Sequence, residues 1–166
     1  MTTDQGPRLT TGGPDAELAA VLDAGLDEYN FAATGTGKAD QGQFSVKVVD
    51  EAGSIVGGLT AWYWAGLCGI SMLWVRAQSR KDGWGSKILE AAQDEARRRG
   101  CDRVCVSSFT FQAPAFYERH GYVETGRTLG IPGPVSGAGT GVGTSAGGGP
   151  GHPAEAADVH LFKRLD

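Results

Sequence analysis

The chain has 166 residues, three cysteines and a formal net charge of −4 at pH 7. Its length suits one domain that buries its own core, and its acidity excludes a protein that wraps duplex nucleic acid, because phosphate binding requires a basic surface. Cys68, Cys101 and Cys105 form no CxxC pair and have no matching histidine cluster, so we expect buried thiols and neither a disulfide framework nor a metal site.

The N-terminal half of the sequence predicts one helix and three strands after a short strand at residues 7–10. Residues 15–33 predict an amphipathic helix, because apolar side chains recur there at helical spacing: Leu18, Val21, Leu22, Leu26 and Tyr29. The turn sequences DEAG and AG then separate three β-rich runs, at about residues 43–50, 54–65 and 67–76. These runs predict an antiparallel meander.

The stretch RKDGWGSKILEAAQDEARRRG, residues 80–100, predicts a glycine turn followed by a charged helix that ends near Arg99. A buried strand at residues 101–109, a short helix over residues 113–121 and a strand that begins at Tyr122 follow it. The arginines of DEARRR lie where the helix dipole favours cations, so we interpret them as a solvated helix end and not as a basic patch.

Residues 132–157 consist mainly of glycine, alanine, proline and small polar residues, a composition that cannot bury enough apolar surface to fold. We expect a flexible loop there. The next residues, DVHLFKRL, alternate as a strand does, so the loop interrupts a hairpin and does not link two domains. One domain over residues 1–166 is therefore expected.

Membrane association is not indicated by the sequence. The segment MTTDQGPRLTTGG is polar and lacks the apolar core of a signal peptide. No run approaches the roughly 18 apolar residues that a membrane span requires. We expect a cytoplasmic protein that binds neither nucleic acid nor a membrane.

The glycine turn lies where a strand passes into a helix, an arrangement in which backbone N–H groups and the helix dipole converge on an anion. Gly83 and Gly85 would let the anion approach the main chain, which a side chain would block. The segment GTGKAD, residues 35–40, is not a phosphate loop, because its first glycine and its hydroxyl residue are missing and no strand precedes it. A bare GxG does not by itself distinguish an anion site from an ordinary helix start.

Two motifs, about thirty residues apart in the sequence, resemble the GCN5-related N-acetyltransferase superfamily. The residues that carry the resemblance are Arg80, Gly83 and Gly85 in RKDGWG, and Phe116, Tyr117, Gly121 and Tyr122 in FQAPAFYERHGY. The order of the predicted helices and strands also resembles that of the superfamily, so the resemblance covers almost the whole chain. It implies an α/β fold with a mixed, mostly antiparallel sheet of six to seven strands flanked by helices, and it implies acetyl-CoA as the donor.

The resemblance implies that the diphosphate of acetyl-CoA binds to the glycine turn, formed by Arg80, Lys81, Asp82, Gly83, Trp84, Gly85 and Ser86. A bulge or splay in the preceding strand would free backbone N–H groups to polarise the thioester carbonyl, at Leu73, Trp74 and Val75. The pantetheine arm would be lined by Gln112, Ala113 and Phe116, with Arg119 left open between this arm and solvent. Asp82 departs from the family pattern, because a carboxylate beside a diphosphate is repulsive unless it points to solvent or pairs with a lysine.

For catalysis, the resemblance assigns Tyr117 as the phenol that protonates the leaving thiolate. The family has no single base position, and Glu28 is our candidate. The acceptor would bind among the first helix, the third strand and the last strand, at Glu28, Tyr29, Trp62, Trp64, Asp158 and His160. Trp62 and Trp64 project to one face of their strand, where they form either an aromatic wall for a cation or part of the core.

We therefore expect an acetyltransferase that acts on a primary amine of a small, cationic molecule by direct attack in a ternary complex. The acceptor classes are an antibiotic, such as an aminoglycoside of the kasugamycin type, or a polyamine. An antibiotic acceptor would imply a role in antibiotic resistance. Two alternative functions stay open: a protein amino-group acetyltransferase and a non-catalytic module that senses acyl-CoA. Whether the protein forms a homodimer also stays open.

Overall fold

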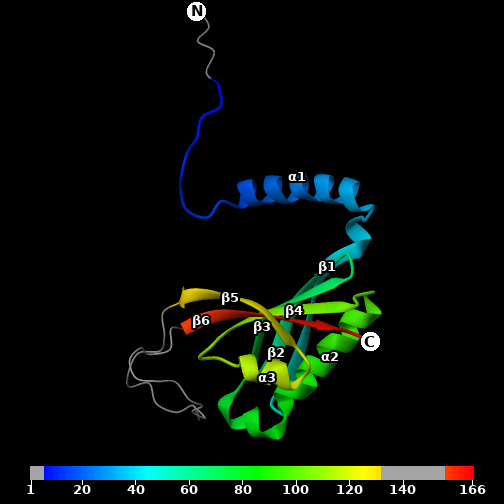
Figure 1. Cartoon of the computed structure of the whole chain (residues 1–166), viewed down its shortest axis with the longest axis vertical. Helices are drawn as coiled ribbons and strands as arrows, with labels where there is room; N and C mark the ends of the chain where they lie inside the picture. Colours follow the sequence, from blue (N-terminus) through cyan, green and yellow to red (C-terminus); the bar gives the residue numbers. More distant parts are fainter. Residues whose placement is uncertain (1–5, 132–155) are drawn as a thin grey trace, which may run out of the picture. The chain divides into compact units, whose positions relative to one another are not determined.

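The computed structural model describes residues 6–131 and 156–166, which Figure 1 draws in colour. The chain divides into two units, one that ends at Gly37 and one from Lys38 to Asp166. A single acetyltransferase domain over residues 1–166 stays a prediction. Most of the loop expected at residues 132–157 lies outside the described residues, and its last two residues belong to a strand.

The unit before Lys38 contains one long helix, α1 (Ala16–Thr34), where the apolar spacing predicts it. Asp15 caps its N-terminus, because the side chain accepts a hydrogen bond of 2.9 Å from the N–H of Leu18. Gly35 ends the helix in the left-handed conformation. The strand expected at residues 7–10 is wrong: these residues have no regular structure, since an extended segment is stable only when it pairs with a neighbouring strand.

The second unit is a mixed α/β structure whose described residues form a six-stranded sheet in the order β1-β2-β3-β4-β6-β5 (Figure 1). All neighbouring strands are antiparallel except β3 and β4, which are parallel. The predicted fold class is therefore confirmed. The strands are β1 (Gln41–Val49), β2 (Ile55–Trp64), β3 (Leu67–Val75), β4 (Arg103–Phe109), β5 (Val123–Ile131) and β6 (Ala156–Arg164).

The predicted helices of this unit are α2 (Trp84–Arg98) and α3 (Pro114–Arg119). Two short 3-10 helices were not predicted: η1 (Lys38–Asp40) precedes β1, and η2 (Ala77–Asp82) connects β3 to α2. In the part of the chain that the structure describes, no helix is both long and apolar enough to cross a lipid bilayer.

A two-residue turn closes the predicted hairpin between β2 and β3. Ala65 and Gly66 both have positive φ, 49° and 84°, which is the backbone geometry that such a short link between antiparallel strands requires. The turn between β1 and β2 uses Asp50, whose Oδ1 accepts hydrogen bonds from the N–H groups of Ala52 at 3.1 Å and Ser54 at 2.9 Å. The turn sequences AG and DEAG are thus confirmed.

Helix α2 supplies much of the core. Its buried residues recur at helical spacing and pack with buried residues of the sheet: Ile88, Leu89, Ala92 and Ala96 with Leu59, Val104 and Leu161. On β4, Val104 and Val106 are buried, so the intervening Cys105 and the following Ser107 point to the opposite face of the sheet. This alternation leaves polar side chains of β4 available on that face.

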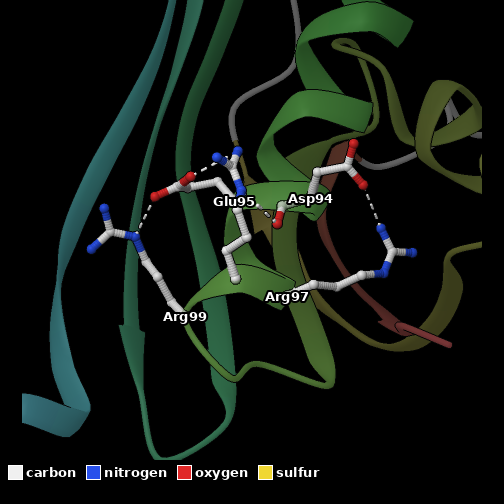
Figure 2. A network of polar contacts seen from close by, with 5 residues as sticks. Asp94, Glu95, Arg97 and Arg99 are labelled. Atoms are coloured by element: carbon white, nitrogen blue, oxygen red, sulfur yellow. Dashed lines mark hydrogen bonds and ion pairs between the residues drawn. The ribbon is translucent and has the colours of Figure 1, made fainter.

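The C-terminal end of α2 carries the arginines of DEARRR in a network of ion pairs (Figure 2). Arg97 lies 2.8 Å from Asp94. Glu95 pairs with two arginines, with Arg98 at 2.9 Å and with Arg99 at 2.7 Å. Because each arginine has a carboxylate on the same helix, the segment is a helix end and not a free basic patch, as predicted.

Strands β3 and β4 separate partway along their length. Their parallel pairing stops at Ile70 and Val106, although β3 continues to Val75 and β4 to Phe109. At the same point β3 bulges: Ile70 pairs with Ala61 of β2 and Met72 pairs with Thr60, so Ser71 is the extra residue. The edge of β3 beyond Ile70 that faces β4 therefore has no strand pairing within the described sheet.

Candidate active site

The separation of β3 and β4 opens a cavity of about 920 Å³, which we call the first cavity. Its wall comes from β3, η2, the start of α2, β4 and α3. The residues predicted for the donor site that line it are Leu73, Trp74, Val75, Arg80, Gly83, Gly85, Ser86, Gln112, Ala113, Phe116 and Tyr117. Arg119, which the sequence left open, lines it as well.

Gly83 sets the geometry at the start of α2. Its φ of 72° lies in the left-handed region, and a Cβ placed on it would meet no atom within 4 Å. The first intrahelical bond of α2 runs from the N–H of Lys87 to the carbonyl of Gly83, at 3.2 Å. The N–H groups of a helix's first turn have no carbonyl in a preceding turn, and the helix dipole makes this end positive. The cavity wall at Gly83 is thus suited to an anion.

Glycine is needed at position 85 for a different structural reason than at position 83. A Cβ on Gly85 would lie 3.3 Å from the ring of Phe116, which is tighter than ordinary van der Waals contact. The sequence argument gave both glycines the same purpose, the approach of an anion. The structure separates them: Gly83 provides the backbone conformation, and Gly85 lets α2 pack against α3.

Three residues of the predicted turn do not line the first cavity: Lys81, Asp82 and Trp84. Lys81 and Asp82 are exposed to solvent, and Trp84 packs against the core with the Lys87 ammonium 4.5 Å from its ring centroid. Because Asp82 is absent from the cavity wall, its carboxylate does not oppose an anion there. Arg80 contributes a guanidinium to the wall, oriented by a 2.9 Å hydrogen bond from its Nε to the carbonyl of Val75.

Ser86, His120 and Phe116 form a polar link between α2 and α3. Nε2 of His120 lies 2.9 Å from Oγ of Ser86, and Nδ1 lies 2.7 Å from the carbonyl oxygen of Phe116. The imidazole also packs on the Phe116 ring, with 4.5 Å between the ring centroids. Sequence reasoning placed Ser86 in the donor site but missed His120, because only the fold brings these two residues together.

Tyr117 is buried, and its ring is held by edge contacts with Phe116 and Tyr122, at centroid distances of 5.2 and 5.5 Å. Burial raises the pKa of Tyr117 to about 12. The phenol therefore stays protonated at physiological pH and can donate a hydrogen bond into the first cavity, which it lines.

A second cavity, of about 410 Å³, adjoins the first. The two share four wall residues at the point where β3 and β4 separate: Ile70, Ser71, Val106 and Ser107. The rest of its wall is formed by Trp62, Gly69, Cys105, Thr125, His160, Leu161 and Phe162. The shared residues make a junction between the cavities at the end of the strand pairing.

Of the residues predicted for the acceptor, Trp62 and His160 line the second cavity, whereas Trp64 and Asp158 do not. Glu28 and Tyr29 belong to α1, in the other unit. Trp62 lies over Gly69, because a Cβ on Gly69 would clash with its indole ring. Of the two tryptophans, only Trp62 is therefore placed to form an aromatic wall in this cavity.

His160 is held by hydroxyl groups from both neighbouring strands. Its Nδ1 lies 2.8 Å from Oγ of Ser107 on β4, and its Nε2 lies 3.1 Å from Oγ1 of Thr128 on β5. Sequence reasoning missed Ser107 and Thr128. The pairing of β6 between β4 and β5 brings them to His160, and the sequence carries no signal for that order of strands.

Comparison with known protein families matches residues 41–124 to the acetyltransferase (GNAT) domain. The matched segment runs from β1 to the start of β5, so it contains both the glycine turn and the FYERHGY segment. It thus includes every residue that lines the first cavity.

Individual relatives agree with the family match. Acetyltransferase Atu2258 of Agrobacterium fabrum is 30% identical over 112 residues, which cover 68% of this chain and 80% of that protein. Blasticidin-S acetyltransferase of Streptomyces morookaense is 40% identical over 76 residues, 43% of this chain and 54% of that protein. The crystal structure of an acetyltransferase from Bacillus cereus has a TM-score of 0.70 and 26% identity, and covers 95% of this chain and 98% of its own.

Proposed function

The chain belongs to the GNAT acetyltransferase family, and from this premise we propose that it moves an acetyl group from acetyl-CoA to the primary amine of a small cationic molecule. Members of the family are acyltransferases that use acetyl-CoA, so the enzyme class and the donor follow from membership. The observation that carries the rest of the proposal is the junction of the two cavities, because transfer requires donor and acceptor to meet at one point.

The first cavity fits the donor. Its anion-binding end, at Gly83, suits a diphosphate, and Arg80 adds a cation to the same wall. When bound, acetyl-CoA supplies the acetyl group as an activated thioester. The edge of β3 beyond Ile70, which pairs with no strand in the described sheet, offers backbone N–H groups that would polarise a carbonyl. Tyr117 would donate a hydrogen bond to the departing thiolate.

The second cavity fits a small acceptor, because its volume of about 410 Å³ admits an amine of limited size and not a folded protein surface. Trp62 and Phe162 provide aromatic faces for a cationic group. No carboxylate lines this cavity among the described residues, so its wall gives no anionic partner to a polycation. We therefore favour an acceptor with one amine in the cavity over a polyamine.

Ser107 and His160 would accept the proton that the amine loses. As the new C–N bond forms and the C–S bond breaks, the amine N–H passes its proton to Oγ of Ser107, and Ser107 passes its own proton to Nδ1 of His160. In this arrangement Nε2–H of His160 donates to Thr128, which leaves Nδ1 free to accept. This pair takes the place of the base candidate Glu28.

Replacement of the proton relay gives the first prediction. Ser107→Ala and His160→Gln should each lower kcat about 100-fold, the size of a general-base contribution, with the KM for acetyl-CoA unchanged. Release of free thiol from acetyl-CoA measures both quantities. Ser45→Ala, an exposed serine on β1, is the matched control and should have wild-type kcat. A wild-type kcat in both relay variants would contradict the role of the pair.

The function itself is tested with a panel of amines and acetyl-CoA, by thiol release and by mass spectrometry of the product. Blasticidin S comes first, because one relative carries that substrate in its name. An aminoglycoside, a polyamine and a peptide with a free N-terminus complete the panel. We expect a product that is heavier by one acetyl group with at least one small amine. Turnover of the peptide alone, or of no amine, would contradict the proposal.

A further inference from the structure

His120 fixes the direction of two hydrogen bonds at the start of α2. The carbonyl oxygen of Phe116 can only accept, so Nδ1 of His120, 2.7 Å away, carries a proton. In the neutral imidazole Nε2 is then unprotonated and can only accept. The Ser86 hydroxyl, 2.9 Å from Nε2, must therefore donate its proton to His120.

This arrangement determines what Ser86 offers to the first cavity. Ser86 lines the cavity in the first turn of α2, beside Gly83 and Gly85. While its one proton is engaged with His120, its oxygen presents only lone pairs to the cavity, and lone pairs repel an anion. When His120 is protonated, Nε2–H donates to the Ser86 oxygen, and the Ser86 proton is free to point into the cavity.

We propose that His120 is a positioning residue for the donor diphosphate: it takes up a proton when acetyl-CoA binds, and this turns the Ser86 hydroxyl into a hydrogen-bond donor toward the diphosphate. The inference rests on the proposed placement of acetyl-CoA in the first cavity. His120 acts through Ser86 and through the charge that it gains.

The charges around His120 favour this coupling. The charged residues that line the first cavity together with Ser86 are both cations, Arg80 on η2 and Arg119 on α3, and no ion pair among the described residues engages the imidazole. An anion bound between these residues and Ser86 would favour a positive charge on His120, so binding and protonation would support each other.

Calorimetric titration of the full-length protein with acetyl-CoA tests the proposal, between about pH 5.5 and 8.5 and in two buffers of different ionisation enthalpy. Acetyl-CoA carries a phosphate that titrates in the same range, so the measured quantity is the difference between the wild type and His120→Gln. We expect the ratio of wild-type affinity to His120→Gln affinity for acetyl-CoA to be about tenfold higher at pH 6 than at pH 8. A factor of this size is what one charge-assisted hydrogen bond provides. The wild type should also take up more protons on binding.

Ser86→Ala separates the two parts of the effect. It removes the hydroxyl but keeps the imidazolium, so part of the pH dependence should survive.

Nitrogen NMR of the ligand-free wild type checks the tautomer without any variant: at pH 8 the His120 signals should show Nδ1 protonated and Nε2 unprotonated. The opposite tautomer would overturn the proposal.

The outcomes distinguish this inference from the proposed function. If acetyl-CoA binds tightly with the same pH dependence in the wild type and in His120→Gln, only the role of His120 is wrong. If acetyl-CoA binds at no pH, the placement of the donor fails, and the inference fails with it.

Discussion

At the residue scale, the acidity of Tyr117 decides how it can assist the reaction. Burial raises its pKa to about 12, whereas an ordinary thiol has a pKa of about 8.5. Complete proton transfer from this phenol to a thiolate is therefore uphill. A hydrogen bond from the neutral phenol to the developing thiolate carries no such cost, so we propose this role for Tyr117 in place of the complete proton transfer that the family resemblance implied.

The Tyr117→Phe variant tests this role. Loss of the donor should lower kcat about tenfold or more and leave the affinity for acetyl-CoA unchanged, because the ring still packs against Phe116 and Tyr122. The wild-type rate should show no alkaline loss from this group up to about pH 10, since its phenol stays protonated there. Steady-state thiol release gives both readouts. An unchanged kcat in the variant would remove Tyr117 from the mechanism.

Gly83 combines a backbone requirement with a steric one, and two variants separate them. Valine at φ of 72° is strained, by about 1 to 3 kcal/mol, whereas asparagine tolerates this region. Gly83→Val should lower both the Tm and the affinity for acetyl-CoA. Gly83→Asn should keep most of the Tm and still weaken binding about tenfold, because its side chain lies at the cavity wall. Wild-type affinity in Gly83→Asn would contradict an anion site there.

At the element scale, the α-helices and the strands of the sheet followed from local patterns, whereas the two 3-10 helices and the contacts between elements did not. The spacing of Ile88, Leu89, Ala92 and Ala96 predicted the buried face of α2, and the AG sequence predicted the turn at Ala65. The bulge at Ser71 and the separation of β3 from β4 depend on strand register, for which the sequence has no local signal.

The same distinction explains which site residues were predicted. Leu73, Arg80 and Gly83 lie in or beside a recognisable motif and were named from the sequence. Ser107 and His160 are 53 positions apart, and Ser86 and His120 are 34 apart. The first pair is brought together by the order of the strands, and the second by the packing of α3 on α2. Neither arrangement can be read from the local sequence around these polar residues.

Helix α2 should carry a large share of the stability of the second unit. Leu89 is fully buried, so Leu89→Ala should lower the free energy of unfolding by about 3 kcal/mol through lost burial and the remaining void. Leu129→Ala is the matched control, because Leu129 is 65% exposed and should change the value by less than about 0.5 kcal/mol. Urea unfolding measures both. Equal effects of the two variants would show that α2 is not the packing centre.

At the scale of the whole molecule, the proposed function depends on the separation of β3 from β4 in the described part of the sheet. Six described strands and α2 form the support, and the loss of pairing after Ile70 accompanies two cavities that meet at Ser71 and Ser107. In the proposed function, the first cavity would bind the anionic part of the donor at the helix start, and the second cavity would offer the acceptor aromatic faces and a hydroxyl–imidazole pair. Transfer of an acetyl group between two bound molecules is the chemistry that this arrangement supports best.

The crystal structure of the complex with acetyl-CoA is the most direct measurement of this account. We expect the diphosphate to lie against the backbone N–H groups from Gly83 to Ser86, and the thioester to lie between β3 and β4, next to Tyr117 and open to the second cavity. Acetyl-CoA bound away from the start of α2, or a thioester closed off from Ser107 and His160, would contradict it.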